Sequence, residues 1–148
     1  MIECHSVDQN TDEWMSLRCG KITASQFKTA FMGKSTKGYS DLIYTKRAEI
    51  KTGEIEDSYS NAWMERGHEL EPLAREAYEI ETFSEVKNGC FWTISDYIGA
   101  SPDGLVGDDG LIEIKCPKAS TVERYHDKGV LPTEYFWQVH GQMMCTGR

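Results

Sequence analysis

Residues 99–119 read GASPDGLVGDDGLIEIKCPKA, and this stretch predicts more about the fold than any other part of the chain. Its second half contains an apolar run, residues 111–115, that includes one carboxylate and one ammonium group. Because the side chains of a strand alternate between its two faces, Glu113 and Lys115 share one face, and the two isoleucines of the run share the other. The pattern therefore predicts a strand with one face in the core and one face available for chemistry.

A glycine-rich turn at residues 107–110 can fold the chain back as a hairpin, which would bring Asp103 beside Glu113. Two carboxylates repel each other unless a cation lies between them, and hard oxygen ligands with room for water and phosphate suit Mg²⁺ or Mn²⁺. A lysine beside such a metal, here Lys115, can orient or deprotonate an attacking water and stabilise charge on a phosphate. For the Glu-x-Lys fragment taken by itself, an ordinary solvated strand face is the alternative interpretation.

The complete pattern is more specific than its parts, because SPDGL at residues 101–105 is followed by EIKCP at residues 113–117. Together the two segments resemble the core motif of the PD-(D/E)xK nucleases, and in particular the branch that contains lambda exonuclease and the YqaJ-type viral recombinases. The resemblance implies an α/β fold of the restriction-endonuclease type, with a central mixed β-sheet flanked by α-helices. It also implies a metal site formed by Asp103, Glu113 and the backbone carbonyl of Ile114.

Two short helices are expected near the N-terminus, at residues 11–20 and 23–31. The first has a capping threonine and acids in its first turn, and the second begins with the spacing of a capping box. Ser25 then lies in a first helical turn, where free N–H groups and the nearby Arg18 suit an anionic phosphate, although a plain cap and a surface arginine are the simpler alternative. Residues 17–25 also resemble the N-terminal motif of the family, which implies that Arg18 and Ser25 bind the terminal 5′-phosphate of DNA.

A third helix, with a serine at its N-cap, is expected at residues 40–52, and a longer helix is expected at residues 63–81. Pro72 should kink or divide the longer helix, because proline lacks a backbone donor and clashes with the preceding turn. Most charged residues of this helix are expected on its solvated face. The segment GHELEP at residues 67–72 resembles the family helix that lends a further acid to the metal site, which implies a metal-binding role for Glu71.

Strands are expected at residues 86–93 and 97–100, with bends at residues 88–89 and 95–96. With residues 111–115 they are expected to form the centre of one mixed sheet. Residues 54–59 are expected to form an acidic connection. Capping-box spacing predicts a further short helix at residues 120–127.

The final helix is expected at residues 134–146 and contains YFWQVHGQM. This segment resembles the helix that follows the catalytic strand in the family, which implies that Gln138 points into the active site. His140 stands where the family usually has glutamine, so it is given no role. A basic cluster that could face a DNA backbone lies between the catalytic strand and this helix. It consists of Lys118, Arg124 and Lys128.

The composition, with 39% hydrophobic and 27% charged residues, is typical of a globular protein. No segment approaches the roughly 20 apolar residues of a membrane helix, and no signal peptide is evident, so we expect a cytoplasmic protein of a bacterial or phage-infected cell. The five cysteines form no C-x-x-C pair, which argues against a disulfide framework, a zinc knuckle or an iron–sulfur nuclease. The net charge of −8 disfavours nucleic-acid binding, although bound metal would offset part of it.

The length of 148 residues indicates one domain, residues 1–148, with a single substantial core. The resemblance to the family extends from Trp14 to Gly147, but family members continue into edge strands and a C-terminal helix. We therefore expect this chain to lack those C-terminal elements, either because it is a fragment or because something else completes the sheet.

From the residues and the resemblance together, we expect a Mg²⁺-dependent 5′-to-3′ exonuclease that acts on the ends of linear double-stranded DNA in phage-type homologous recombination, with Mn²⁺ as the other candidate metal. Asp103 and Glu113 would hold the metal and Glu71 would help with a second ion. Lys115 would position the attacking water with support from Gln138. The family implies a homotrimeric ring and a single-strand annealing protein as partner. The alternatives are a PD-(D/E)xK endonuclease of another branch and a non-catalytic DNA-end-binding module.

Overall fold

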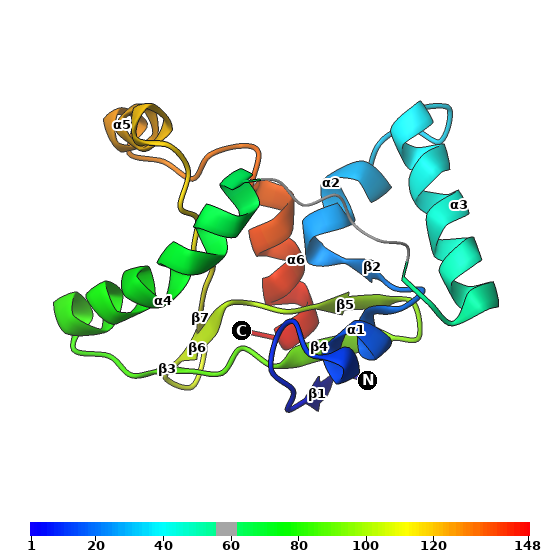
Figure 1. Ribbon diagram of the computed structural model, residues 1–148, viewed down its shortest axis with the longest axis horizontal. Coiled ribbons are helices and arrows are strands. Elements are labelled where there is room, and N and C mark those ends of the chain that lie inside the picture. Colours follow the sequence, from blue (N-terminus) through cyan, green and yellow to red (C-terminus); the bar gives the residue numbers. More distant parts are fainter. Residues whose placement is uncertain (56–61) are drawn as a thin grey trace.

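The structure is a computed structural model that describes residues 1–55 and 62–148. The expected acidic connection at residues 54–59 therefore lies mostly outside the described residues. Figure 1 shows helix α6 (Phe136–Thr146) in the middle of the molecule, with one long helix on one side of it and the N-terminal helices on the other. None of the helices in the described part of the chain combines the length and the apolar character needed to cross a membrane.

The larger sheet has four strands in the order β1-β4-β5-β2 and is mixed, as expected, but residues 111–112 lie in a separate sheet and not at its centre, so the expectation of one sheet is wrong. Strands β1 (Glu3–His5), β4 (Phe91–Ser95) and β5 (Ile98–Ala100) are antiparallel neighbours, and β2 (Ile22–Thr23) pairs with β5 in parallel. The sequence did not predict β1 or β2, because strands of two or three residues are too short to show an alternating pattern.

A second sheet of three strands, in the order β3-β6-β7, contains the expected hairpin. It consists of β3 (Val86–Lys87), β6 (Gly104–Val106) and β7 (Gly110–Ile112), all antiparallel. The bend expected at residues 88–89 is present and divides the expected strand at residues 86–93 into β3 and β4. Cys90 has a φ of +59°, and the side chain of Asn88 accepts its N–H at 2.7 Å. The turn sends the two halves into different sheets.

The expected catalytic strand at residues 111–115 ends early, at Ile112. The last ladder bond runs from the N–H of Asp103 to the carbonyl of Ile112, at 3.1 Å. The next available donor, the N–H of Ile114, bonds instead to the side chain of Asp103 at 2.6 Å. A carboxylate thus takes the place of a neighbouring strand, and Glu113 lies just beyond the sheet rather than at its centre.

Helix α1 (Asp12–Arg18) forms as predicted, with its N-cap at Thr11. The threonine hydroxyl accepts the N–H of Trp14 at 3.2 Å, which satisfies one free donor of the first turn. Trp14 is buried with Val7 and Phe91 in a small apolar cluster. This cluster fixes α1 against β4 and holds the arginine at the end of the helix in place.

The expected second helix is a 3₁₀ turn, η1 (Ala24–Gln26), followed by one α-helical turn, α2 (Phe27–Ala30). Its capping box is present, because the side chain of Gln26 accepts the N–H of Thr23 at 3.1 Å. Ser25 is exposed within the 3₁₀ turn, and its hydroxyl lies 3.1 Å from that of Thr23. Ser25 is thus in a first turn, as expected, but the helix is shorter.

Helix α3 (Lys37–Thr52) begins before the expected position. Thr36 is its N-cap, and the expected cap, Ser40, already donates its N–H to the carbonyl of Thr36 at 3.1 Å. Threonine and serine are both good caps, so local sequence alone does not select between them. The C-terminal end agrees with the prediction, because Gly53 has a φ of +75° and closes the helix in the left-handed conformation.

Helix α4 (Ala62–Thr82) is continuous, so Pro72 does not divide it. The carbonyl that loses its donor belongs to His68, an exposed residue, and solvent can replace that bond. Helix α5 (Ala119–Lys128) begins one residue earlier than expected, after Lys118, and shows no side-chain cap. The expected capping serine is therefore inside the helix.

Helix α6 packs on β4, β5 and η1, and it begins two residues later than expected. It approaches α2 closely at Gly141, where a Cβ atom would lie 2.6 Å from Cδ2 of Phe27. Phe27, Ala100 and Cys145 are buried together at this contact. This contact fixes the helix that carries Gln138.

Candidate active site

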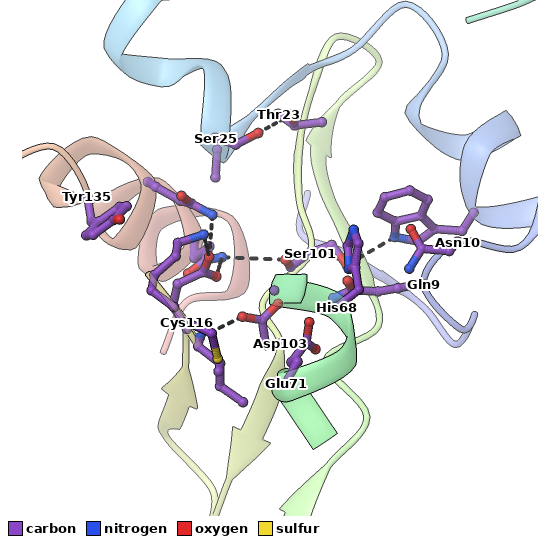
Figure 2. Close-up of a pocket in the computed structure, with 18 of the residues that line it drawn as sticks. Gln9, Asn10, Thr23, Ser25, His68, Glu71, Ser101, Asp103, Cys116 and Tyr135 are labelled. Carbon is purple, nitrogen blue, oxygen red and sulfur yellow. Dashed lines mark hydrogen bonds and ion pairs between the residues drawn. The ribbon is translucent and has the colours of Figure 1, made fainter. Parts of the chain in front are cut away.

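A cavity of about 550 Å³ opens between α1, η1, α4, α6 and the segment that follows β7. Figure 2 shows Glu71 and Asp103 facing one part of this cavity, with Thr23 and Ser25 at another. Every residue that the sequence assigned to the site contributes to its lining. These are Arg18, Ser25, Glu71, Asp103, Glu113, Ile114, Lys115 and Gln138.

Asp103 is held rigidly at the start of the hairpin. Its main-chain N–H and its side chain bond to the segment at Ile112 and Ile114, on the other arm. The preceding Pro102 is fully buried, and the backbone at Gly89 lies so close that a Cβ there would be 1.8 Å from the carbonyl oxygen of Pro102. The position of Asp103 is therefore set by main-chain packing on both sides.

Glu113 accepts hydrogen bonds from donors on two elements. Its Oε1 lies 2.5 Å from Nζ of Lys115 and 2.6 Å from Nε2 of Gln138, while its Oε2 lies 2.6 Å from Nε2 of Gln142. The ring of Tyr135 lies 5.4 Å from the lysine ammonium. The predicted convergence of two carboxylates and one amine is thus present in the structure.

Burial raises the pKa of both central carboxyl groups above the usual range. For Asp103, the N–H of Ile114 opposes this effect, and the nearby charge of Glu71 adds to it. For Glu113, the charge of Asp103 raises the pKa further, and Lys115 lowers it. A positive ion between the two groups would favour their ionised forms.

Glu71 lies on the α4 side of the cavity and is paired with a second residue of that helix. The guanidinium of Arg75 lies 4.0 Å from the Glu71 carboxylate and also donates to the main-chain carbonyl of Asp103. Within residues 1–55 and 62–148, no three His, Cys, Asp or Glu side chains are close enough to share one metal ion. A shared ion would therefore be held by two carboxylates and oxygens of other kinds, which is how Mg²⁺ usually binds.

Arg18 occupies another part of the lining, on the last turn of α1. Its guanidinium lies 4.0 Å from the ring centroid of Trp14, a favourable cation–π distance. Burial lowers the pKa of Arg18, and the negative charge of Glu49 opposes this effect. The indole of Trp14 donates to the hydroxyl of Ser101 at 3.1 Å, and that hydroxyl donates to the carbonyl of Cys90 at 2.9 Å. This chain links α1 to the residues next to Asp103.

A buried ion pair on α3 supports the loop after Arg18. Glu49 is 2% exposed, and both of its carboxylate oxygens lie within 3.0 Å of Nζ of Lys46. One of these oxygens also accepts the N–H of Gly20 at 2.8 Å. Gly20 has a φ of +73°, and a Cβ there would lie 2.6 Å from a side-chain carbon of Ile50. The loop can therefore approach α3 only with glycine at this position.

Several residues with contacts in the site were not assigned to it from the sequence. Gln142 is the clearest case, because it lies one helical turn after Gln138 and therefore on the same face of α6, a spacing that was visible in the sequence. The others act through contacts between distant segments, which no local pattern indicates. They are Trp14, Glu49, Arg75 and Ser101.

Two features of the sequence lie outside the cavity lining. The basic cluster, Lys118, Arg124 and Lys128, is exposed on and next to α5. His140 stacks on Phe136 with ring centroids 4.0 Å apart, and its Nδ1 lies 2.9 Å from the carbonyl oxygen of Phe136.

The model of the YqaJ-like viral recombinase domain matches residues 13–148 of this chain. The chain is also similar to the crystal structure of an alkaline exonuclease, LHK-Exo, from Laribacter hongkongensis, with 41% sequence identity and a TM-score of 0.85 over 93% of this chain and 70% of that one. LHK-Exo in complex with dAMP matches with a TM-score of 0.84 and the same identity and coverage. No curated protein matches the chain. The likeness confirms the predicted fold class.

Proposed function

This chain belongs to the YqaJ-like viral recombinase domain family, and we propose that it is a nuclease that hydrolyses phosphodiester bonds at the ends of DNA. The observation that carries the proposal is the convergence of Asp103, Glu113 and Lys115 in one cavity. The similar protein LHK-Exo is an alkaline exonuclease and forms a complex with dAMP. Release of single nucleotides from a DNA end would give products of that chemical class.

The donor set fits a divalent cation. Asp103, Glu113 and the main-chain carbonyl of Ile114 would hold Mg²⁺ or Mn²⁺, and Glu71 would contribute to a second ion. The raised pKa of the two central carboxyl groups supports this assignment, because a cation would compensate their burial. When bound, the ion would supply Lewis-acid stabilisation of the negative charge on the scissile phosphate.

Lys115 would position the attacking water as the ammonium, or accept a proton from it as the neutral amine. Its ammonium contacts Glu113 and its side chain is 35% exposed, so it can reach both the carboxylate and solvent in the cavity. Gln138 would support this arrangement by holding the same oxygen of Glu113 from α6. Glu113 and Lys115 follow β7 and Gln138 lies on α6, so the contact joins two separate parts of the fold and favours a fixed geometry.

The preference for 5′-phosphorylated ends, and with it 5′-to-3′ polarity on double-stranded DNA, would come from the other part of the cavity. Arg18 can form charge-assisted hydrogen bonds with a phosphate, and the hydroxyl of Ser25 can add a further contact. Because these residues line the same cavity as Asp103, a terminal phosphate bound there would place a phosphodiester near the carboxylates.

Three further parts of the proposal follow from the resemblance to the family. They are a homotrimeric ring around DNA, a single-strand annealing protein as partner in phage-type recombination, and a cytoplasmic location in a bacterial or phage-infected cell. A ring would make digestion processive, because DNA could not leave it easily.

The experiment that tests the proposed function measures nucleotide release from linear duplex DNA with 5′-phosphate ends, from the same DNA with 5′-hydroxyl ends, and from a closed circle. Each substrate is incubated with Mg²⁺ or with chelator. Metal-dependent release from the phosphorylated linear form is the expected result. Nicking of the circle would instead indicate an endonuclease. DNA binding without release on any substrate would indicate an end-binding module and would refute the nuclease proposal.

A further inference from the structure

Gln142 is the most deeply buried polar side chain that touches the carboxylates of the site. It lies on α6, is 1% exposed, and is held in the protein interior behind Glu113. Its Nε2 donates to Oε2 of Glu113 at 2.6 Å and lies 3.5 Å from the carbonyl oxygen of Ser101. Both groups at this end of the amide are oxygen acceptors.

The other end of the same amide has no partner. Oε1 of Gln142 is buried and accepts no hydrogen bond, the one such side-chain atom among the described residues. Leaving a buried acceptor without a donor lowers stability. The opposite amide orientation would direct this oxygen at two other oxygens, so the observed orientation follows from the acceptors around it. The amide N–H of Gln142 thus bonds to Glu113, while its amide oxygen remains without a hydrogen bond.

We propose that Gln142 is a positioning residue that holds Glu113 in the orientation in which that carboxylate binds the divalent cation. The inference rests on the proposed function. All three donors line the cavity, but Gln138 and Lys115 bond only to Oε1 of Glu113, whereas Gln142, which is 1% exposed, bonds to Oε2. Water or substrate can more easily replace the contacts of Lys115 and Gln138, whose side chains are less buried. The contact of Gln142 is almost fully buried, so it fixes the rotation of the carboxylate.

Two roles for Gln142 can be compared. If it served only to pack α6, its side chain should stabilise the fold. Its amide, however, has a buried oxygen without a hydrogen-bond partner, which lowers stability. The two roles therefore predict opposite outcomes for Gln142→Met, which keeps the length of the side chain and removes both polar atoms. The substitution removes the unsatisfied oxygen but also the donor to Oε2 of Glu113, so for a positioning role the melting temperature in chelator should change little and cation binding should weaken.

The test measures the dissociation constant for Mn²⁺ alone by isothermal titration calorimetry, together with the melting temperature in chelator. Gln142→Met should raise the dissociation constant at least tenfold. In the background of Glu113→Gln, the same substitution should add no further loss, because the effect of Gln142 passes through Glu113. An equal loss in both backgrounds would overturn the inference.

Thr146→Val is the matched control. Thr146 is also buried on α6, one turn further on, and its hydroxyl donates to the main-chain carbonyl of Gln142 at 2.8 Å. This substitution should lower the melting temperature and leave the Mn²⁺ dissociation constant unchanged. If the wild-type chain neither binds Mn²⁺ nor releases nucleotides, the proposed function fails. If the wild type does both and Gln142→Met binds Mn²⁺ equally well, only the inference about Gln142 fails.

Discussion

Replacement of Arg18 by methionine should remove the proposed preference for 5′-phosphorylated ends. The guanidinium lines the cavity and lies 4.0 Å from the ring of Trp14, so it is already ordered before DNA arrives. A hydrogen bond to a charged group contributes about 1.5–3 kcal/mol, which corresponds to a loss of about 10- to 150-fold in kcat/KM on phosphorylated ends. On 5′-hydroxyl ends the expected loss is about twofold or less, because no phosphate is present to be bound.

The substitution also removes a cation–π contact of about 0.5–1 kcal/mol, which should lower the melting temperature by about 1–4 °C. Arg18→Lys is the matched variant. Lysine keeps the charge but not the planar fork of donors, so it should recover part of the phosphate preference. This comparison separates the charge of the side chain from its shape.

The assay is the ratio of kcat/KM on two duplexes that differ only in the 5′ group, measured at fixed Mg²⁺ and salt. A ratio that falls toward one in Arg18→Met, with an intermediate value in Arg18→Lys, is the expected result. An equal loss of rate on both duplexes would refute the assignment, because it would show that Arg18 supports the fold or the cleavage step rather than the terminal phosphate.

Three other substitutions test other parts of the site. Lys115→Ala should reduce cleavage by about 100-fold or more and leave DNA binding, measured by fluorescence anisotropy, largely intact; loss of binding with normal cleavage would contradict its role. Asp103→Asn should abolish cleavage and raise the melting temperature in chelator at pH 8. The raised pKa of Asp103 means that its contribution to stability is present below about pH 4 and is lost as pH rises through the folded-state pKa, so the gain should disappear in acid. Mg²⁺ at 100 times its dissociation constant should stabilise the wild type by about 2.7 kcal/mol, or about 5–10 °C, and should have little effect on Asp103→Asn. Glu49→Gln should lower the free energy of unfolding by about 3 kcal/mol in chemical denaturation, because it leaves Lys46 buried without its counter-charge. The double variant with Lys46→Met should recover most of this loss. An unchanged stability in the single variant would contradict a stabilising role for this ion pair.

Features of the fold that depend on local chemistry were predicted from the sequence. The glycine-rich turn gave the β6–β7 hairpin, and Thr11 and Gly53 close helix ends as expected. For the catalytic strand, a contact between the two arms of the hairpin decided the outcome. The strand at residues 111–115 ends at Ile112 because the side chain of Asp103 captures the next N–H, and sequence patterns contain no information about that competition.

Some residues of the site could also be predicted from local sequence, and others could not. The spacing of Asp103, Glu113 and Lys115 on a hairpin was sufficient to predict that they would meet, because a hairpin fixes its own register. The support for Arg18 was not predictable, since Glu49 reaches Gly20 from a helix that begins after an intervening loop. Gln142 lies between these cases: its helical face was predictable, but its burial and its partner depend on how α6 packs.

The residues around the cavity carry several local costs in stability that the proposed chemistry would explain together. Asp103 and Glu113 are buried with raised pKa values, and Gln142 leaves an acceptor without a partner. None of these features stabilises the chain by itself, and each would be removed by an apolar substitution. A divalent cation would compensate the two carboxyl groups and would make use of the fixed orientation of Glu113. The residues that lower stability locally are therefore concentrated where a cation and a phosphate would bind. The buried ion pair of Glu49 and Lys46 lies outside the lining of this cavity.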